Sequence, residues 1–414
     1  MSKKTLKVSF CEVCGNKDLH TVLNLGFHPM CDDLVSQNEN RICKEYPIEI
    51  LFCEKCITAH QKYQIPKAEL FPNSYHYRSR FTADVLNGMK NLVDRTVEIF
   101  GSLDGKKVLD IGCNDGSLLD LFREKGAVTL GIEPTGACTD AIAKQHIVYN
   151  EFFTMKVAKM MLDQYPYGRP DFICFTNVFA HIENLKGVIG ALNFLSDKNT
   201  KIIIENHYLG SVLNGYQFDT FYHEHPRTYS HRSFTYIANS LKKEIINVDF
   251  PSRYGGNIRV FIGNKAFKNS LLNYDPKKIE NEETLFNEKF IAMNLGIQKW
   301  KKYKNMLILN YFRTKGKLKA KAFPGRAAIL IKLLGLDENI ISAVYEKPGS
   351  LKIGHYVPGT KIPILSDDEL FRMTNLNEPI INLAWHINTE IKKYLRNNGY
   401  KGKIIDILNK EDFN

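Results

Sequence analysis

Four consecutive residues could together carry out proton transfer: Tyr222, His223, Glu224 and His225, in the stretch FDTFYHEHPRTYS. Imidazole titrates near neutral pH, and a phenol or a carboxylate beside it can donate, accept or orient a proton. A polar surface loop would explain the same composition without any chemistry. The run therefore predicts an acid–base site, provided that the rest of the chain supplies a binding site around it.

Four cysteines form two Cys-x2-Cys pairs, Cys11 with Cys14 and Cys53 with Cys56. Each pair bends two thiolates toward one ion, and two pairs complete the tetrahedral shell that Zn²⁺ prefers. Four sulfur ligands leave no open position for water, so the predicted metal is structural. It is expected to supply folding energy to a segment whose apolar content is thin.

A glycine turn follows a short apolar run at residues 108–116, VLDIGCNDG, and Glu133 ends the next apolar run. The ends of two such strands flank the ligand crevice of a doubly wound sheet, where an acidic residue can hold the hydroxyls of a ribose. Asp110 and Asp115 are unfavourable neighbours for a pyrophosphate, but they suit a ligand with a sulfonium and an amino group. The turn therefore favours S-adenosylmethionine over NAD, and a plain strand–turn–helix connection is the alternative.

The elements that must position these residues alternate between strand and helix. The strand patterns are 106–112, 128–134, 170–178 and 200–207, and an amphipathic helix pattern covers 117–126. This alternation predicts an α/β fold with a parallel, doubly wound sheet. Beyond residue 265 the sequence predicts a long helix at 285–316 and then a smaller α/β unit. We expect three domains: a zinc-binding module at 1–75, a cofactor-binding domain at 76–262 and a C-terminal α/β domain at 263–414.

The totals of the chain are those of a globular protein with more than one domain: 414 residues, of which 44% are hydrophobic and 24% charged. We find no apolar run long enough to cross a membrane and no signal peptide, and we expect a cytoplasmic protein without a membrane partner. The net charge of +11 suits anionic small molecules or nucleic acid. A zinc-ribbon nucleic-acid-binding protein is therefore an alternative. Against it, the zinc segment is not the basic part of the chain, and no nucleic-acid partner is expected.

Several motifs together resemble one enzyme family. These are the four cysteines, YHYRS at 75–79, NVFAHIEN at 177–184, FDTFYHEH at 218–225, YGGNIRVF at 254–261 and HYVPGTKIPI at 355–364. The chain resembles the nucleotide-sugar C-methyltransferases over nearly its full length. The resemblance implies a class I methyltransferase core with a Rossmann-like fold, bound Zn²⁺ and S-adenosylmethionine, and a C-terminal Rossmann-like domain that contributes to nucleotide-sugar binding. The cofactor-binding residues it implies are Asp110, Gly112, Asn114, Gly116, Glu133 and Asn177.

The same resemblance implies a nucleotide-linked ketosugar as substrate. A carbon nucleophile must first lose a proton, and a proton beside a carbonyl is acidic enough to leave as an enolate forms. His225 is the expected base, and Tyr222 either donates to the enolate oxygen or is the competing base. Glu224 would anchor a sugar hydroxyl or orient a neighbour, while His181 and Tyr77 (or Tyr75) would reach the same crevice.

Three further histidines, His223, His207 and His231, are not expected to take part in catalysis. Strand-like alternation would point His223 away from its neighbours, and His207 and His231 are expected to be structural.

Two positions depart from the family pattern. The segment 323–327 reads FPGRA where members tend to carry G-A-P-A-K, although Arg326 could still meet a phosphate, and Tyr254 stands where members usually carry histidine. The nucleotide carrier is therefore left open among thymidine, guanosine and cytidine. A sugar O-methyltransferase of capsule or lipopolysaccharide biosynthesis is the leading alternative function. A monomer or weak homo-oligomer is expected.

Overall fold

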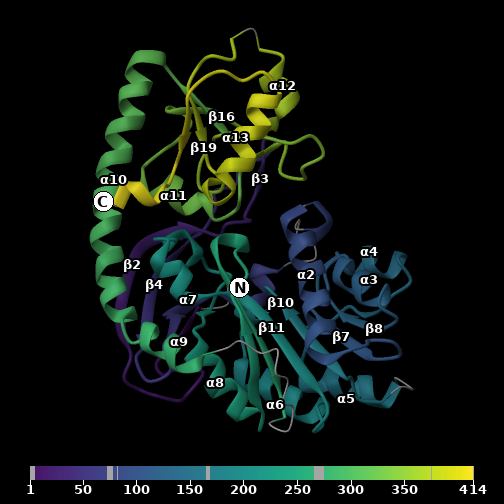
Figure 1. Cartoon of the computed structure of the whole chain (residues 1–414). Coiled ribbons are helices and arrows are strands. Elements are labelled where there is room, and N and C mark those ends of the chain that lie inside the picture. Colours follow the sequence, from purple (N-terminus) through teal and green to yellow (C-terminus); the bar gives the residue numbers. More distant parts are fainter. Residues whose placement is uncertain are drawn as a thin grey trace. The chain divides into compact units, whose positions relative to one another are not determined.

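The computed structural model describes residues 5–71, 78–81, 83–164, 168–264, 275–373 and 375–413. The chain forms two compact units, each assembled from separate stretches of sequence (Figure 1). Unit 1 contains Met1–Thr21, Leu51–Val212 and Glu224–Asn287. Unit 2 contains Val22–Ile50, Leu213–His223 and Glu288–Asn414.

Unit 1 is built on a seven-stranded sheet of order β13-β14-β11-β10-β7-β8-β9 (Figure 1). Its strands are β7 (Lys107–Ile111), β8 (Val128–Ile132), β9 (Ile147–Tyr149), β10 (Phe172–Thr176), β11 (Lys201–His207), β13 (Glu244–Asp249) and β14 (Asn257–Gly263). The pairs from β9 to β11 are parallel, whereas β14 is antiparallel to both β11 and β13. The chain order 3-2-1-4-5 of the parallel strands is that of a doubly wound sheet, so the predicted fold class is confirmed.

Apolar runs explain the central position of these strands. Strand β10 (FICFT) and the middle of β11 (III) are buried on both sides, as parallel strands covered by helices must be. One face packs against an apolar stripe of α2 (Ala83–Phe100) and against α3 (Ser117–Arg123). The remaining helices of unit 1 are α1 (Lys67–Leu70), α4 (Cys138–Ala143), α5 (Met155–Gln164), α6 (Leu185–Leu195), α8 (His231–Ser240) and α9 (Pro276–Glu283), while α7 (Leu209–Asn214) ends unit 1 and enters unit 2.

The N-terminal segment contributes short strands. In unit 1, β5 (Thr58–Gln61) pairs antiparallel with β12 (Arg227–Thr228), and β1 (Leu6–Lys7) pairs with β6 (Tyr63–Gln64). Strands β2 (His20–Pro29) and β4 (Glu45–Cys53) run across the division of the chain into units. The β5–β12 pair places Arg227 opposite His60 in the ladder. The zinc-binding segment is therefore hydrogen-bonded to the chain immediately after residue 225.

Unit 2 is built on a five-stranded, wholly parallel sheet of order β18-β16-β15-β19-β20. Its strands are β15 (Leu318–Lys321), β16 (Ile341–Glu346), β18 (Ile364–Ser366), β19 (Ile380–Asn382) and β20 (Ile404–Asp406). The helices are α10 (Phe286–Lys315), which begins at the end of unit 1, α11 (Ala327–Leu333), α12 (Asp367–Phe371) and α13 (Asn388–Asn397). A further pair joins β3 (Val35–Ser36) to β17 (His355–Tyr356). The predicted second α/β unit is confirmed.

Among the described residues, no helix combines the length and the apolar character needed to cross a bilayer.

Candidate functional site

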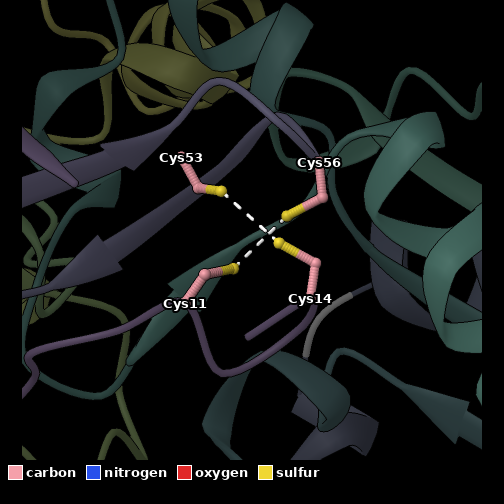
Figure 2. A group of neighbouring side chains, drawn as sticks. All are labelled: Cys11, Cys14, Cys53 and Cys56. Carbon is pink, nitrogen blue, oxygen red and sulfur yellow. Dashed lines mark hydrogen bonds between the residues drawn. The ribbon is translucent and has the colours of Figure 1, made fainter. Parts of the chain in front are cut away.

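The four paired cysteines converge on one point (Figure 2). The Sγ atoms of Cys11 and Cys56 lie 3.3 Å apart and those of Cys14 and Cys53 lie 3.6 Å apart, with all four within 4.8 Å of one another. Four sulfurs at about 2.3 Å from a tetrahedral Zn²⁺ would lie about 3.8 Å from each other. The residues therefore fit a structural zinc ion, as the spacing predicts.

The sulfurs need a cation because they are crowded and buried. The pKa of Cys11 is raised to about 12, first by its contact with Cys53 and then by burial, against a lowering contact with Cys56. Contacts with Cys11 and Cys53 also raise the pKa of Cys56. Polar neighbours surround the cluster: His60 Nε2 lies 3.3 Å from the Cys11 sulfur, and Thr58 Oγ1 lies 3.0 Å from the Cys56 sulfur. A divalent cation would offset the charge that the thiolates acquire.

The glycine turn after β7 has the backbone geometry that a close ligand approach requires. Gly112, Asn114 and Gly116 have φ values of +77°, +49° and +76°, in the left-handed region. A Cβ at Gly112 would stand 2.4 Å from a methyl group of Val178, so no larger residue fits there. The Asn114 side-chain oxygen accepts the Ser79 N–H at 3.0 Å, so the segment that begins at residue 78 lies on the turn.

Glu133 stands at the end of β8 beside this turn and is buried. Its Oε1 accepts from the Thr135 N–H at 2.9 Å and the Thr135 hydroxyl at 2.6 Å, and its Oε2 accepts the Asn114 N–H at 3.0 Å. A carboxylate has about four acceptor positions. The described residues make three hydrogen bonds to Glu133, so one acceptor position would remain for a ribose hydroxyl.

Asp110 lies within β7, and its carboxyl is the unusual group of the site. Within the described part of the chain, its Oδ1 is buried and has no hydrogen-bond partner. Burial, followed by the nearby negative charge of Glu133, raises the pKa of Asp110 to about 8. A cationic ligand would favour its ionised form, which fits a group that carries a sulfonium and an amine. Asp115 instead accepts the Arg80 N–H and the Ser117 hydroxyl, so it fixes the turn itself.

Replacing Glu133 with glutamine is expected to weaken S-adenosylmethionine binding by about 1.5–3 kcal/mol, because an acceptor bond to a charged group is lost. Glutamine keeps the size of the side chain, so the turn should stay folded. Titration calorimetry measures the change, with Asp94→Asn at a half-buried surface ion pair as a control for removal of a carboxylate. Unchanged affinity, or tighter binding of NAD than of S-adenosylmethionine, would refute the assignment.

Three imidazoles and a phenol gather at the carboxyl edge of the same sheet. The rings of His181 and His225 have centroids 4.8 Å apart, His207 and His225 5.1 Å, and His207 and Tyr254 5.7 Å. His207 ends β11, and β14 begins opposite it, since Asn257 pairs with His207 in the ladder. His225 is almost fully buried. The alternative of a polar surface loop is therefore excluded for His225, which lies in the interior.

His181 is held in a defined protonation state. It lies in the 3-10 helix Phe179–His181 after β10, and its Nδ1 donates to the Glu224 carbonyl at 2.7 Å. Burial lowers the pKa of His181 to about 4, against the raising effect of its backbone hydrogen bonds. His181 is thus neutral at pH 7. Two imidazolium ions at this separation would repel, so a neutral His181 lets His225 gain a proton.

A buried ion cluster supports this edge of the sheet. Glu205, fully buried on β11, accepts from Arg253 Nε at 2.6 Å, from Arg259 Nε at 2.7 Å and from the Asn257 amide at 3.0 Å. Burial alone would raise the pKa of Glu205, but the two guanidinium groups outweigh it and lower the pKa. Arg253 precedes Tyr254, whose φ of +55° is uncommon for an aromatic residue. The cluster therefore fixes the backbone that presents Tyr254.

Replacing Glu205 with glutamine is expected to destabilise the protein by about 3–5 kcal/mol, because two buried guanidinium groups would lose their counter-charge. Urea unfolding followed by circular dichroism measures the loss. The matched control is Glu98→Gln, which breaks the surface ion pair of Glu98 with Arg95 and should change stability by about 0–1 kcal/mol. Equal effects of the two variants would contradict this account.

The remaining predicted site residues lie in different parts of the chain, and not all of them are described by the structure. The Asn177 side-chain oxygen accepts from the Asn257 amide at 3.1 Å, so its expected cofactor contact stays a prediction. Tyr77 and Tyr75 lie outside the described residues. Tyr222 and His223 belong to unit 2, and Glu224 begins the next stretch of unit 1. His223 contacts the Tyr46 carbonyl through Nε2 at 3.1 Å, but residues 223–224 form a turn, so the strand alternation expected there is wrong.

The sequence interpretation missed His207 and Tyr254 as members of the ring cluster. His207 was expected to be structural, yet its ring lies beside those of His225 and Tyr254. The available signal was its place at the carboxyl end of the fourth apolar strand pattern, where ligand-contacting residues of such sheets gather.

Unit 2 has a polar cluster at the carboxyl ends of β15 and β19, where its strand order reverses. Arg326 Nη1 donates to the Thr220 hydroxyl at 2.9 Å and Nε lies 3.3 Å from Asp219. The Trp385 indole N–H also donates to Asp219, at 2.9 Å, and the Arg326 guanidinium lies 5.1 Å from the Trp385 ring centroid. No described residue makes a hydrogen bond with the buried Arg326 Nη2. A cation with an unused donor at such a point suits an anionic ligand.

Three family models match consecutive parts of the chain. A "Putative zinc binding domain" matches residues 11–71, a "Methyltransferase domain" matches 81–247, and a "C-methyltransferase C-terminal domain" matches 252–406. The three matches follow the order of the cysteine cluster, the seven-stranded sheet and the C-terminal sheet.

Individual proteins are similar to this chain at low sequence identity. The C-methyltransferase NovU of Streptomyces niveus is 24% identical over 398 residues, which span 94% of this chain and 93% of that protein. The solved structure of magnesium protoporphyrin IX methyltransferase from Synechocystis PCC 6803 with bound SAM is 17% identical and covers 44% of this chain and 80% of its own, with a TM-score of 0.33. The solved structure of a SAM-dependent methyltransferase from Archaeoglobus fulgidus is 17% identical. It covers 50% of this chain and 87% of its own, also with a TM-score of 0.33.

Proposed function

We propose that this S-adenosylmethionine-dependent methyltransferase, whose chain matches the models of a zinc-binding domain, a methyltransferase domain and a C-methyltransferase C-terminal domain, methylates a carbon atom of a nucleotide-linked ketosugar. The bound cofactor supplies an electrophilic methyl group on a sulfonium. The residues that would hold it are the glycine turn, Glu133 with its remaining acceptor position and the buried Asp110. The proposal keeps the three expected domains, with boundaries at about residues 75 and 262.

The observation that carries the proposal is the cluster of His181, His207 and His225 at the carboxyl edge of the cofactor-binding sheet. Oxygen and nitrogen nucleophiles already carry a lone pair, whereas a carbon beside a ketone has none until it loses a proton to a positioned base. His225 takes that proton, and neutral His181 keeps the pair from carrying two positive charges. Burial of His225 limits its contact with water, which would protonate the enolate again.

The remaining catalytic roles follow the chemistry of each group. Tyr222 donates to the enolate oxygen or is the competing base, Glu224 anchors a sugar hydroxyl or orients a neighbour, and Tyr77 contributes from the end of the zinc-binding segment. The Glu224 carbonyl already has a role, since it accepts from His181 and fixes that ring.

Unit 2 would bind the nucleotide carrier. The buried Arg326, with one donor unused, is suited to a phosphate oxygen, and Trp385 offers a ring against which a base can stack. The second candidate that charge alone suggested, a nucleic-acid-binding protein, gains no support from this pair, because both residues are buried or half-buried and not part of an exposed basic stripe. The proposal includes a cytoplasmic location, which agrees with the free cysteines of the structure, and a monomer or weak homo-oligomer.

The test is incubation of pooled nucleotide ketosugars with the enzyme and S-adenosylmethionine, followed by mass spectrometry for a methyl gain. Nuclear magnetic resonance of the product then distinguishes a methyl group on carbon from one on oxygen. A C-methyl product supports the proposal. An O-methyl product would replace it with a sugar O-methyltransferase, and steeply salt-dependent retention on nucleic acid with no product would favour a nucleic-acid-binding protein.

A further inference from the structure

A continuous set of contacts leads from the metal cluster toward the segment that follows His225. His60 is fully buried, and its Nε2 contacts the Cys11 sulfur at 3.3 Å. On its other side, Nδ1 faces the Glu12 carboxylate at 3.7 Å, an electrostatic contact beyond hydrogen-bond length. Glu12 Oε2 in turn accepts from Arg227 Nη1 at 2.5 Å. A residue between the two cysteines of the first pair therefore holds an arginine two residues after the proposed base.

Arg227 is an unusual residue to find in this place. Its side chain is fully buried, its Nε donates to the Tyr229 hydroxyl at 3.0 Å, and among the described residues Glu12 is the acidic partner of its guanidinium. A buried guanidinium is tolerated only when it is paired. The metal cluster sets the position of Glu12, because Glu12 lies between Cys11 and Cys14. A change in that position would therefore shift the paired Arg227 side chain and the backbone that carries it.

The backbone contacts point the same way. Gln61 N–H donates to the Pro226 carbonyl at 2.8 Å, and Pro226 directly follows His225. Strand β12, which contains Arg227, pairs with β5, which begins two residues after Cys56. Further along, the Ser233 hydroxyl donates to the Cys56 carbonyl at 3.2 Å. Both Cys-x2-Cys segments thus contact the chain between residues 226 and 233, the first through Glu12 and the second through the Cys56 carbonyl.

On its other side the segment is held by the cofactor-binding domain, through the bond from His181 to the Glu224 carbonyl. The backbone here has little regular structure of its own and is held on both sides of His225. His181 bonds the residue before it, and the zinc-binding segment bonds the residues after it. We propose that Arg227 is a positioning residue for the reaction: paired with Glu12, it couples occupancy of the metal site to the placement of Glu224 and His225. The proposal rests on the assignment of His225 as the base.

The experiment uses the zinc-loaded, full-length protein and three variants: Arg227→Met, Glu12→Gln and the double variant. Each is checked for zinc content by metal analysis and for S-adenosylmethionine affinity by calorimetry. Two readouts then follow the segment: amide hydrogen exchange of a peptide that covers residues 224–230, and the side-chain ¹⁵N resonances of His225. Arg95→Met, which removes a different arginine–carboxylate pair of unit 1, is the matched control.

We expect zinc content and cofactor affinity to stay within about twofold of the wild type, while exchange of the peptide accelerates by about tenfold or more and the His225 resonances shift. The double variant should resemble the single variants, because the two residues act as one pair. Chelation of zinc from the wild type should reproduce the shift, and Arg95→Met should not.

Wild-type exchange and unshifted His225 resonances in a zinc-loaded variant would overturn the proposal. So would loss of zinc from both single variants, since the pair would then serve the metal site and not the segment. If Arg227→Met does not fold, the measurements on Glu12→Gln alone test the proposal. None of these readouts needs the acceptor, so failure of the proposed function, seen as absence of a C-methyl product, is distinguishable from failure of this inference.

Discussion

Replacing His225 with asparagine is expected to lower turnover by about 10²–10⁴-fold, the contribution typical of a general base. Asparagine retains hydrogen-bonding capacity but cannot accept the proton. Binding of S-adenosylmethionine should be unchanged, because the glycine turn follows β7 and Glu133 follows β8, separate from the segment that contains His225. Single-turnover assays give the rate, and calorimetry gives the cofactor affinity.

Solvent deuterium exchange tests the same step without methyl transfer. The wild-type enzyme, supplied with the demethylated cofactor, should wash deuterium into the carbon beside the ketone, and His225→Asn should lose this exchange. Tyr222→Phe should slow it only moderately if Tyr222 donates to the enolate. Exchange that persists without His225 and disappears without Tyr222 would reverse the two roles.

The matched control is His223→Asn, the same change two residues earlier. His223 contacts the Tyr46 carbonyl in unit 2, so the variant should lose some stability but keep its turnover per folded molecule. A rate loss equal to that of His225→Asn would show that disturbance of the run, and not loss of the base, lowers activity.

Replacing Cys53 with serine is expected to abolish zinc binding and unfold the N-terminal part of unit 1. Structural zinc contributes about 10–16 kcal/mol of apparent binding free energy in small zinc domains, and most of that depends on a complete thiolate set. The wild type should hold one zinc ion per chain. Metal analysis of the purified variant and its thermal unfolding temperature measure both effects.

Cys43→Ser is the control for this experiment, because Cys43 is also buried but donates its S–H to the Asp33 carbonyl and lies outside the cluster. This variant should retain zinc. Zinc-free wild-type protein, or a Cys53→Ser variant with full metal content, would exclude the site.

Local patterns were sufficient for much of the molecule. The spacing of Cys11, Cys14, Cys53 and Cys56 predicted a four-sulfur site, and the four sulfurs do converge. The apolar runs at 106–112 and 128–134 predicted adjacent parallel strands, which β7 and β8 are. Such features depend on residues a few positions apart, whose periodicity and turn chemistry are present in the sequence itself.

Features that depend on distant pairing could not be obtained in this way. The direction of β14 is set by its partners β11 and β13, and its own residues are as buried as those of a parallel strand. For the same reason His207 was missed, since only the fold brings its ring beside His225. The contact between Glu12 and Arg227 joins residues 215 positions apart, with no local pattern to indicate it.

The discontinuous make-up of unit 2 has a consequence for biosynthesis. Its strand β3 pairs with β17, and Gln37 bonds to the His355 carbonyl 318 residues later. At about 5–20 residues per second, a ribosome needs roughly 15–65 s to deliver that partner after the first strand has emerged. During this interval the early strands are without their final neighbours, whereas the cysteine pairs, whose Cys14 and Cys53 are 39 residues apart, are both already outside the tunnel. Metal capture can therefore close the ends of the early segment into a loop before the partner of β3 has been synthesised, so the zinc site orders part of the nascent chain ahead of its long-range strand pairing.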